Sequence, residues 1–420
     1  MSPGFSAVFD DYRGLPRSIY VIFVSRIVNS MGAFVWPFLA IYLTTNLGIG
    51  EAQAGLISTI SIFVHIPGSI LGGYLTDSIG RKNIIIASMG LSALMYVPCA
   101  FLSPSMTIPV LLILSSFFMG ASDPAASAMV ADLTEPKNRK ASFSLIYLGI
   151  NIGFSLGPLI AGFLYNDYIE LIFLGDAFTT FISIMVIYVY VEETMPCAND
   201  IEKTMEGRSY DERPEEGSLF HVICRRPYLF AFAFISLILW FVFSQMSFSL
   251  PLYMKDIFGI ERGPQLFGIL MSVNGMVVVI MTIFLIALTK RFRPILNVAL
   301  SGVLGAFGFL MYSLTSNFTL FIAATALWTF GEILDATNSG VYIANHTPVS
   351  HRGRFNAIIN IIRGAGGSIN PLFMGLFIEM YSLRMVWPFV FVLGMIGSGL
   401  MFMLYILEKR KAEKTECVSP

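Results

Sequence analysis

Residues 73–82 have the sequence Gly73-Tyr-Leu-Thr-Asp77-Ser-Ile-Gly80-Arg81-Lys82, and they connect two long apolar runs at 53–76 and 83–102. Glycines, an aspartate and two adjacent cations are typical of a tight, charged turn. An apolar run of about 20 residues is long enough to cross a hydrocarbon layer about 30 Å thick. We therefore expect this stretch to lie where one membrane helix ends and the next begins.

The composition of the whole chain favours the same class. Apolar residues make up 55% of the 420 residues and charged residues only 13%, and the mean hydropathy is +0.73. A soluble globular domain does not have this composition. The net charge of −1 gives no indication of a nucleic-acid partner, and the four cysteines have neither metal-ligand nor redox spacing. We expect no disulfide framework, no metal and no cofactor.

Twelve apolar runs are long enough to be membrane helices, and a polar, charge-rich segment at 192–226 separates six from six. The sequence predicts an all-α integral membrane protein of two six-helix bundles, at 1–191 and 227–420, joined by a linker at 192–226. The first run is too long for the core of a signal peptide, so we expect it to remain in the mature protein. The predicted spans are 18–43, 53–76, 83–102, 107–132, 139–164, 170–191, 227–254, 264–289, 294–314, 318–345, 354–380 and 384–408.

The positive charges predict the orientation, because Lys and Arg accumulate in cytoplasmic loops. Of the 26 Lys and Arg residues, 21 fall on the side of the N-terminus, and two, Arg26 and Arg363, fall inside spans. The opposite side holds only Lys255, Arg262 and Arg384. Both termini are therefore expected to be cytoplasmic, in a multi-pass protein of the cell membrane (plasma or inner).

The two halves match at a constant offset of 213 residues, which brings together glycines and prolines that have special backbone roles. With six spans in each half, the repeats share one orientation, as in bundles related by an axis along the membrane normal. Such bundles can rock around a central site. The matches are Gly55 with Gly268, Leu75-Thr76 with Leu288-Thr289, Arg139 with Arg352, Gly153 with Gly366, Pro158 with Pro371 and Gly162 with Gly375.

The turn at 73–82 resembles the signature loop of the major facilitator superfamily, Gly-x-Leu-x-Asp-x-x-Gly-Arg-Lys between the second and third membrane helices. The resemblance implies a gate in which Arg81 pairs with an acid at the end of the fourth span. Asp132 is the candidate, and Asp77 is expected to face the start of a helix in the other half. Gly73 and Gly80 complete the gating motif, whose second-half counterpart at 288–293 lacks the acid and the glycines.

A second motif, Gly153-Phe-Ser-Leu-Gly157-Pro158-Leu-Ile-Ala161-Gly162, resembles the antiporter signature of the same superfamily, with Ala161 in place of a usual glycine. Glycines four residues apart let a neighbouring helix approach closely, and Pro158 permits a bend. The chain thus resembles the twelve-helix drug:proton antiporters. It departs from them in the fourth span, where Ser116 stands at the position of their arginine, four residues before Gly120.

Four ionisable residues, Arg26, Asp123, Asp335 and Arg363, lie about 14 Å from the predicted cytoplasmic face, where charge is costly and usually marks a pathway. Arg26 is expected to pair with Asp123, and Arg363 with Asp335 or Glu332. These pairs are either structural or take part in proton coupling. In the second case Asp123, Glu332 and Asp335 are the candidate proton carriers, because separating an acid from a nearby cation changes its proton affinity.

The superfamily resemblance places spans one, four, seven and ten around a central cavity, so polar and aromatic residues at membrane depth are candidate substrate ligands. His65, by contrast, is expected to form a structural hydrogen bond to a neighbouring helix, with proton relay as the alternative. The candidate substrate-binding residues are Arg26, Arg363, Trp36, Trp240, Trp328, Asn29 and Asn338.

These observations predict a secondary transporter that exports amphipathic or lipophilic small molecules by alternating access, driven by protons or by Na⁺. One alternative is transport of an organic anion, such as a siderophore, a carboxylate or a lipid-like metabolite, bound by Arg26 and Arg363. A receptor of the same fold that carries out no transport is another. An enzyme is not expected, since nucleotide-binding loops and nucleophile motifs are absent from the sequence. The expected partners are the substrate, the coupling ion and the lipid bilayer, and the expected state is a monomer.

Overall fold

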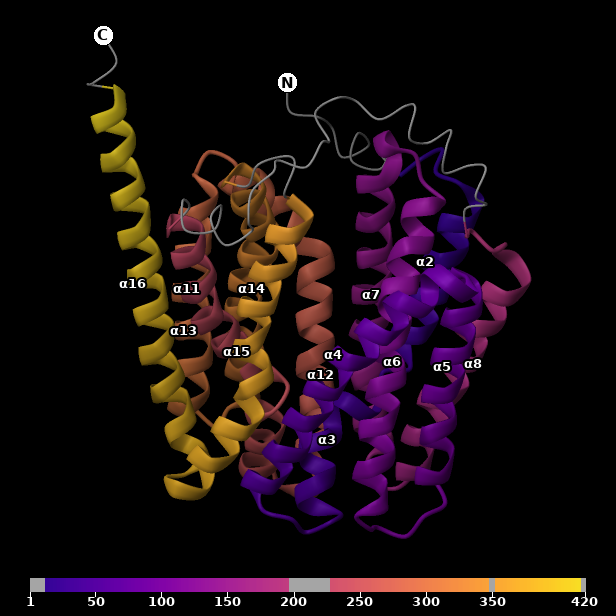
Figure 1. Ribbon diagram of the computed structural model, residues 1–420. Coiled ribbons are helices and arrows are strands. Elements are labelled where there is room, and N and C mark those ends of the chain that lie inside the picture. The colour runs from indigo at the N-terminus through magenta and orange to yellow at the C-terminus, as the bar shows by residue number, and fades with distance from the viewer. Residues whose placement is uncertain (1–11, 196–226, 347–351, 417–420) are drawn as a thin grey trace. The chain divides into compact units, whose positions relative to one another are not determined.

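A computed structural model describes residues 12–195, 227–346 and 352–416, and within these ranges the regular structure is entirely helical (Figure 1). The predicted all-α class is confirmed. The helices are α2 (Arg17–Met31), α3 (Val35–Thr45), α4 (Glu51–Ile79), α5 (Arg81–Cys99), α6 (Thr107–Asp132), α7 (Pro136–Leu164), α8 (Ile169–Tyr190), α11 (Pro227–Phe243), the short η2 (Ser244–Met246), α12 (Ser249–Thr289), α13 (Pro294–Leu314), α14 (Phe318–His346), α15 (Arg352–Met380) and α16 (Leu383–Glu416).

Eleven helical segments among the described residues are long and apolar enough to cross a membrane. One of them, Pro227–Thr289, is 63 residues long and corresponds to two predicted spans. Gly259 separates the two, because its backbone (φ 82°, ψ 169°) is outside the helical region and favours glycine. Each of the twelve predicted spans therefore falls on a helical segment.

The first predicted span is interrupted. α2 ends at Met31 and α3 begins at Val35, and the Phe34 N–H bonds the Gly32 carbonyl at 2.7 Å. A side chain at Gly32 would overlap Thr179 of α8, so the chain passes close to α8 at this break. The interruption places the beginning of a second helix inside the span, where the first backbone N–H groups have no partner within their own helix.

Contacts divide the chain into one unit of Met1–Ala198 with Met254–Val279 and a second unit of Asn199–Tyr253 with Ile280–Pro420. The segment 254–279 thus groups with the first half, although we predicted it in the second bundle. It does so because small residues let α7 and α12 touch: a Cβ at Gly162 would lie 2.7 Å from the Pro264 oxygen, and one at Gly268 would overlap the Pro158 oxygen. The boundary at 192–226 stays a prediction, since 196–226 lies outside the described residues.

Two further helices of the first unit, α4 and α6, are packed backbone to backbone. A Cβ at Gly68 would overlap the Phe117 carbonyl, one at Gly72 the Ala121 carbonyl, and one at Gly120 the carbonyl of His65. Close approach of this kind is the usual role of small residues between membrane helices. It fixes which side chains of α4 reach α6.

This packing predicts different effects for two adjacent glycines. Gly72→Ala places a methyl group against immovable backbone and should destabilise the protein by about 1–3 kcal/mol. Gly73→Ala is the matched control, because its Cβ would lie 3.9 Å from Pro124, an ordinary contact. Thermal unfolding of the two purified variants in detergent measures the difference. Equal melting temperatures would contradict the proposed backbone contact.

The second unit contains a buried aromatic core. Trp328 stacks on Phe309 with ring centroids 5.3 Å apart, and its indole N–H donates to the Tyr312 hydroxyl at 2.9 Å. Trp387 also stacks on Phe309, and both tryptophans are fully buried. Trp328, a candidate substrate residue, therefore belongs to a packed core, and its substrate-binding role stays a prediction.

Candidate functional site

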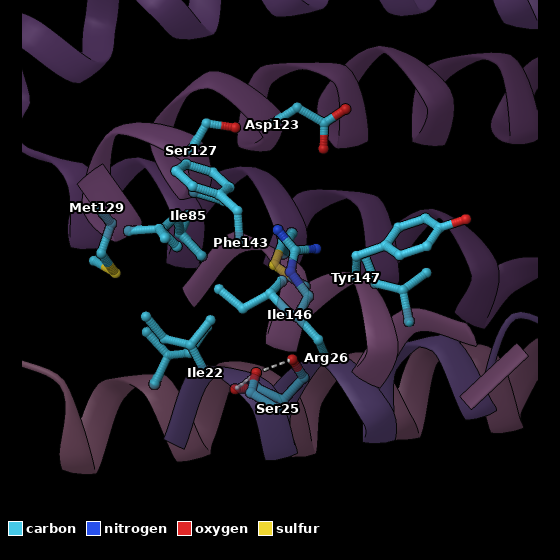
Figure 2. Close-up of a pocket in the computed structure, with 16 residues that line it drawn as sticks. Ile22, Ser25, Arg26, Ile85, Asp123, Ser127, Met129, Phe143, Ile146 and Tyr147 are labelled. Atoms are coloured by element: carbon cyan, nitrogen blue, oxygen red, sulfur yellow. Dashed lines mark hydrogen bonds between the residues drawn. The ribbon is translucent and has the colours of Figure 1, made fainter. Parts of the chain in front are cut away.

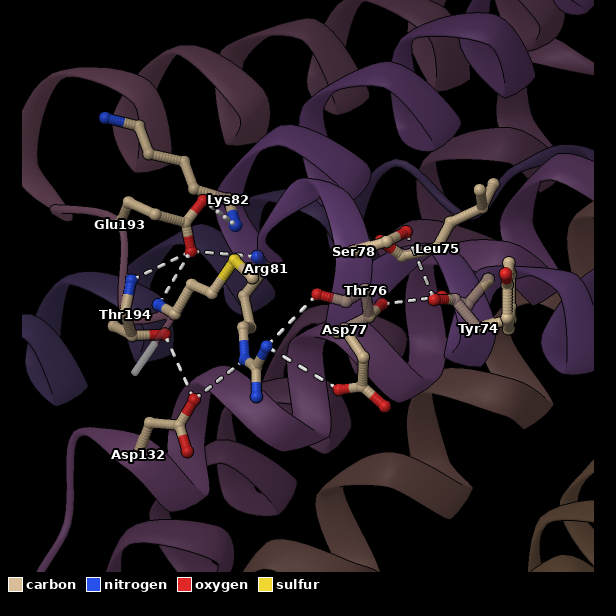
Figure 3. A network of polar contacts seen from close by, with 12 residues as sticks. Tyr74, Leu75, Thr76, Asp77, Ser78, Arg81, Lys82, Asp132, Glu193 and Thr194 are labelled. Atoms are coloured by element: carbon tan, nitrogen blue, oxygen red, sulfur yellow. Dashed lines mark hydrogen bonds and ion pairs between the residues drawn. The ribbon is translucent and has the colours of Figure 1, made fainter. Parts of the chain in front are cut away.

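The turn at 73–82 forms a network of polar contacts (Figure 3). Gly80, with φ 109°, ends α4 and begins α5, a conformation that suits glycine. The Arg81 guanidinium donates from Nε to Asp132 Oδ2 at 2.9 Å and lies 3.6 Å from Asp77 Oδ1. It also donates to the Thr76 carbonyl at 3.1 Å. The predicted pairing of Arg81 with Asp132 is confirmed, and the gating role of the network stays a prediction.

Glu193, which follows α8, joins this network by capping α5. Its two carboxylate oxygens accept the backbone N–H groups of Arg81 at 2.8 Å and Lys82 at 3.0 Å. Burial acts to raise the pKa of Glu193, but backbone N–H donors, including those of Thr194 and Met195, outweigh it and lower the pKa below 4.5. Sequence reasoning placed Glu193 in the linker, because the partner helix of a capping acid cannot be identified from local sequence.

Glu193→Gln should loosen the first turn of α5. A neutral amide keeps one acceptor oxygen but loses the favourable interaction with the helix dipole. Hydrogen exchange of the Lys82 and Asn83 amides at neutral pH should be roughly fivefold faster, corresponding to a cap of about 1 kcal/mol. Because the folded-state pKa is lowered, the wild-type protection is present above pH 4.5 and is lost as the pH falls through the lowered pKa. The variant should lack that acid step, and identical profiles would disprove the cap.

A pocket of about 390 Å³ opens within the first unit (Figure 2). Asp123 and Arg26 come from opposite walls, on α6 and α2, and the walls between them are largely apolar. Such a pocket, apolar with a few convergent polar groups, is typical of a ligand site. It is lined by Ile22, Ser25, Arg26, Ile85, Met89, Asp123, Ala126, Ser127, Met129, Val130, Phe143, Ile146, Tyr147, Ile150, Ser183 and Ile187.

Asp123 is paired with His65 and not, as we predicted, with Arg26. The His65 Nε2 lies 3.0 Å from Asp123 Oδ2, and the Asp123 side chain remains 53% exposed. Within the described residues, Arg26 has no hydrogen bond and no ion pair within 4.0 Å. The direct partner differs from the predicted one because the Gly120 contact brings α4 against α6 one turn from Asp123, which places His65 within hydrogen-bond distance. Arg26 interacts with Asp123 electrostatically at longer range. The expected hydrogen bond from His65 to a neighbouring helix is confirmed.

In the second unit, Arg363 and Asp335 form the predicted pair. Arg363 donates to Asp335 Oδ2 at 2.7 Å, and the two side chains are only 12% and 6% exposed. Ser339 donates to the other carboxylate oxygen at 2.7 Å. The guanidinium carbon lies 5.7 Å from the centre of the exposed Trp240 ring, and the buried Nε has no hydrogen-bond partner. Glu332 is half-buried, one turn before Asp335 on α14.

The remaining candidate substrate residues take part in contacts between helices. The Trp36 indole N–H donates to the Tyr96 hydroxyl at 3.1 Å. Asn29 donates to Thr180 at 3.1 Å, and Asn338 accepts a hydrogen bond from Asn297 at 2.8 Å. Their substrate-binding roles stay predictions, and these contacts are sufficient reason for their polarity.

The antiporter-like motif packs against two helices. A side chain at Gly153 would overlap the Ile27 oxygen of α2, and a Cβ at Gly157 would lie 2.9 Å from the Met31 oxygen. Gly162 and Pro158 contact α12. The motif thus lies on the close-packed side of α7, next to the break between α2 and α3.

Ser116, at the position of the drug exporters' arginine, donates to the Ser61 carbonyl at 2.7 Å. It is buried between α4 and α6. A long cationic side chain has no room at this contact, so this chain does not place a cation in the fourth span as those exporters do.

Comparison with known proteins identifies similar chains over nearly the full length. The family model described as "Major Facilitator Superfamily" matches residues 21–334 and 301–416. The uncharacterized MFS-type transporter YqjV of Bacillus subtilis (strain 168) is 26% identical over 393 residues, covering 93% of each chain. A protein of Planococcus maritimus named "Na(+), Li(+), K(+)/H(+) antiporter" is 27% identical and covers 85% of this chain and 88% of its own.

Among solved structures, a POT family transporter in complex with a thioalcohol conjugated peptide matches with a TM-score of 0.77. Its sequence identity is 13%, and the match covers 95% of this chain and 97% of that chain. A likeness at this identity concerns the fold alone, and it agrees with the fold that the turn at 73–82 predicted.

Proposed function

Because this chain belongs to the major facilitator superfamily and is a multi-pass membrane transporter, we propose that it exports an amphipathic small molecule in exchange for protons by alternating access. The single observation that carries this proposal is the His65–Asp123 pair, whose carboxylate lines a pocket that also contains Arg26. Two titratable groups 3.0 Å apart can share a proton, and the half-exposed carboxylate can exchange it with water.

In this proposal, proton binding and substrate binding take place in the same pocket. A bound substrate near Arg26 and Asp123 changes the charge around the carboxylate, and a carboxylate changes its proton affinity when a nearby charge moves. Most of the lining is Ile, Met, Val and Phe. An amphipathic molecule with one charged group therefore suits the site better than a strongly polar solute. The name of the Planococcus maritimus relative, an antiporter that exchanges cations for H⁺, supports exchange for protons as the energy source.

A second candidate is an organic anion, and Arg26 favours it. An arginine in a pocket with no ion-pair partner among the described residues is the expected ligand for a carboxylate or phosphate group. Asp123 would then be the proton carrier for the same cycle, so the two candidates differ in the charge of the substrate and not in the coupling residue.

We propose that the protein is a monomer in the cell membrane with both termini cytoplasmic. The concentration of Lys and Arg in the loops on one side supports the orientation. Modification of Cys417 by a membrane-impermeant thiol reagent in a variant lacking the other three cysteines tests the orientation. Labelling of intact cells would contradict a cytoplasmic C-terminus.

The function is tested with purified protein in liposomes that have an imposed pH gradient. Internal pH is recorded while organic cations, neutral amphiphiles, organic anions and the salts of Na⁺, Li⁺ and K⁺ are added in turn. Proton movement with organic cations or neutral amphiphiles supports the leading proposal, and movement with anions alone supports the second. A response to the inorganic cations alone would replace both with cation–proton antiport, and no response to any solute would contradict proton coupling.

A further inference from the structure

Asp176 on α8 is a buried carboxylate of the first unit, and it is not among the residues that line the pocket. It is 6% exposed, and its Oδ2 accepts the backbone N–H of Val35 at 3.4 Å. Val35 is the first residue of α3, so the carboxylate lies at the beginning of the helix that follows the break in the first span. The transport cycle built on Asp123 and His65 does not use this group.

Asp176 forms no ion pair among the described residues, and the groups that stabilise its charge are the backbone N–H groups of Phe34 and Val35. Within the described residues, no Lys, Arg, His or second carboxylate from α2, α3, α5 or α7 contributes to its charge environment, and the titratable group that faces it is Tyr96 of α5. Tyr96 already accepts a hydrogen bond from Trp36. An ionised carboxylate at membrane depth without a cation is costly, and such groups usually have a function.

The two protonation states of Asp176 hold α3 differently. The carboxylate is attracted by the N–H groups and the positive end of the dipole of α3, whereas the neutral acid loses most of that attraction. The break itself is tightly enclosed, because a side chain at Gly32 would overlap Thr179 and a Cβ at Gly175 would lie 2.5 Å from the Phe34 ring. A change of charge at Asp176 therefore acts on the junction between α2 and α3.

A line of polar contacts connects this junction to the pocket. Along α8, Asp176 is followed one turn later by Thr180, which accepts from Asn29, and then by Ser183, whose hydroxyl lies 2.6 Å from that of Ser25. Ser25 and Ser183 line the pocket together with Arg26. We call these three pairs the polar seam: on α8 they involve Asp176, Thr180 and Ser183, and opposite them Val35, Asn29 and Ser25. The seam runs from the helix break to the pocket wall that carries Arg26.

We propose that Asp176 is a second proton-binding site of this transporter, where uptake of one proton by the carboxylate loosens α3 and shifts α2 through the polar seam. The inference rests on the proposed proton antiport and adds a coupling group to it. One proton is taken up by an Asp176 oxygen and released from it in each cycle. The Val35 N–H can donate to either form, but it is held less strongly by the neutral acid.

The proton itself can be observed by infrared difference spectroscopy of the purified protein as the pH is lowered from about 9 to about 5. A buried protonated carboxyl gives a carbonyl stretch that is separate from those of ionised groups. Asp176→Asn should lose one such band, Asp176→Glu should keep a shifted band, and Asp77→Asn, which removes a largely exposed acid, should leave the band unchanged. Retention of the full band in Asp176→Asn would overturn the proposal.

Coupling is measured by the number of protons moved per substrate in liposomes. Asp176→Asn should move fewer than the wild type, and Asp176→Glu should restore the number. Loss of the band with an unchanged proton number would overturn the coupling role. If the wild type moves no protons while the band is lost only in Asp176→Asn, the proposed antiport fails and the proton site stands, so the two failures can be distinguished.

Discussion

Asp123→Asn should abolish accumulation of substrate against its gradient, reducing pH-driven transport in liposomes to the level of protein-free vesicles. The amide keeps the shape of the carboxylate and can still bond His65, but it cannot take up or release a proton. Substrate exchange at equal pH on both sides should continue, because alternating access needs the pocket and not the proton. The two assays on one preparation therefore separate coupling from binding.

Ser127→Ala is the matched control for this experiment, since Ser127 lies one turn further along α6 and lines the same pocket. It should retain uphill transport. His65→Gln should preserve a hydrogen bond to Asp123 and weaken the pH dependence of transport, because only one of the two titratable groups remains. Normal uphill accumulation by Asp123→Asn would exclude Asp123 as the proton carrier.

Asp335→Leu should destabilise the protein severely, by about 3–5 kcal/mol. It leaves the Arg363 guanidinium buried without its carboxylate, and the Nε of that guanidinium has no partner even in the wild type. Ser339 would also lose the acceptor of its hydroxyl. Thermal unfolding in detergent, followed through the loss of helical signal, measures the cost.

The double variant Asp335→Leu/Arg363→Met is the control, because replacing a buried ion pair by apolar residues is often neutral. It should recover most of the stability. If it also transports normally, the pair is structural, which was one of the two alternatives; if it folds but does not transport, the pair takes part in the cycle. A single variant as stable as the wild type would show that Arg363 finds solvent or another partner.

The Arg81–Asp132 pair and the Arg363–Asp335 pair could be predicted because the possible partners of each arginine are few. Arg81 follows directly after a turn that only glycine suits, and an acid at the end of a nearby span was its natural partner, which Asp132 proved to be. Arg363 had two candidate partners on α14, Glu332 and Asp335, and it pairs with Asp335. In both cases, depth in the membrane and the cost of an unpaired charge left little choice.

The partners of Asp123, Glu193 and Asp176 could not be predicted in this way. Asp123 was assigned to Arg26 by depth, but depth does not say which helix faces which. Glu193 looked like the beginning of a polar linker, and it caps a helix more than 100 positions away in the chain. Asp176 lies in an apolar run with no local sign that a helix begins against it.

By itself the sequence determined the helical membrane class, the position of the twelve spans and the turn at 73–82, because span length and turn chemistry depend on neighbouring residues. Only the tertiary structure decided which charges meet. A helix can rotate about its axis without changing its hydropathy, and the rotation is set where backbones touch, as at Gly72 and Gly120 between α4 and α6. Those contacts place His65 against Asp123, whereas Arg26 lines the pocket.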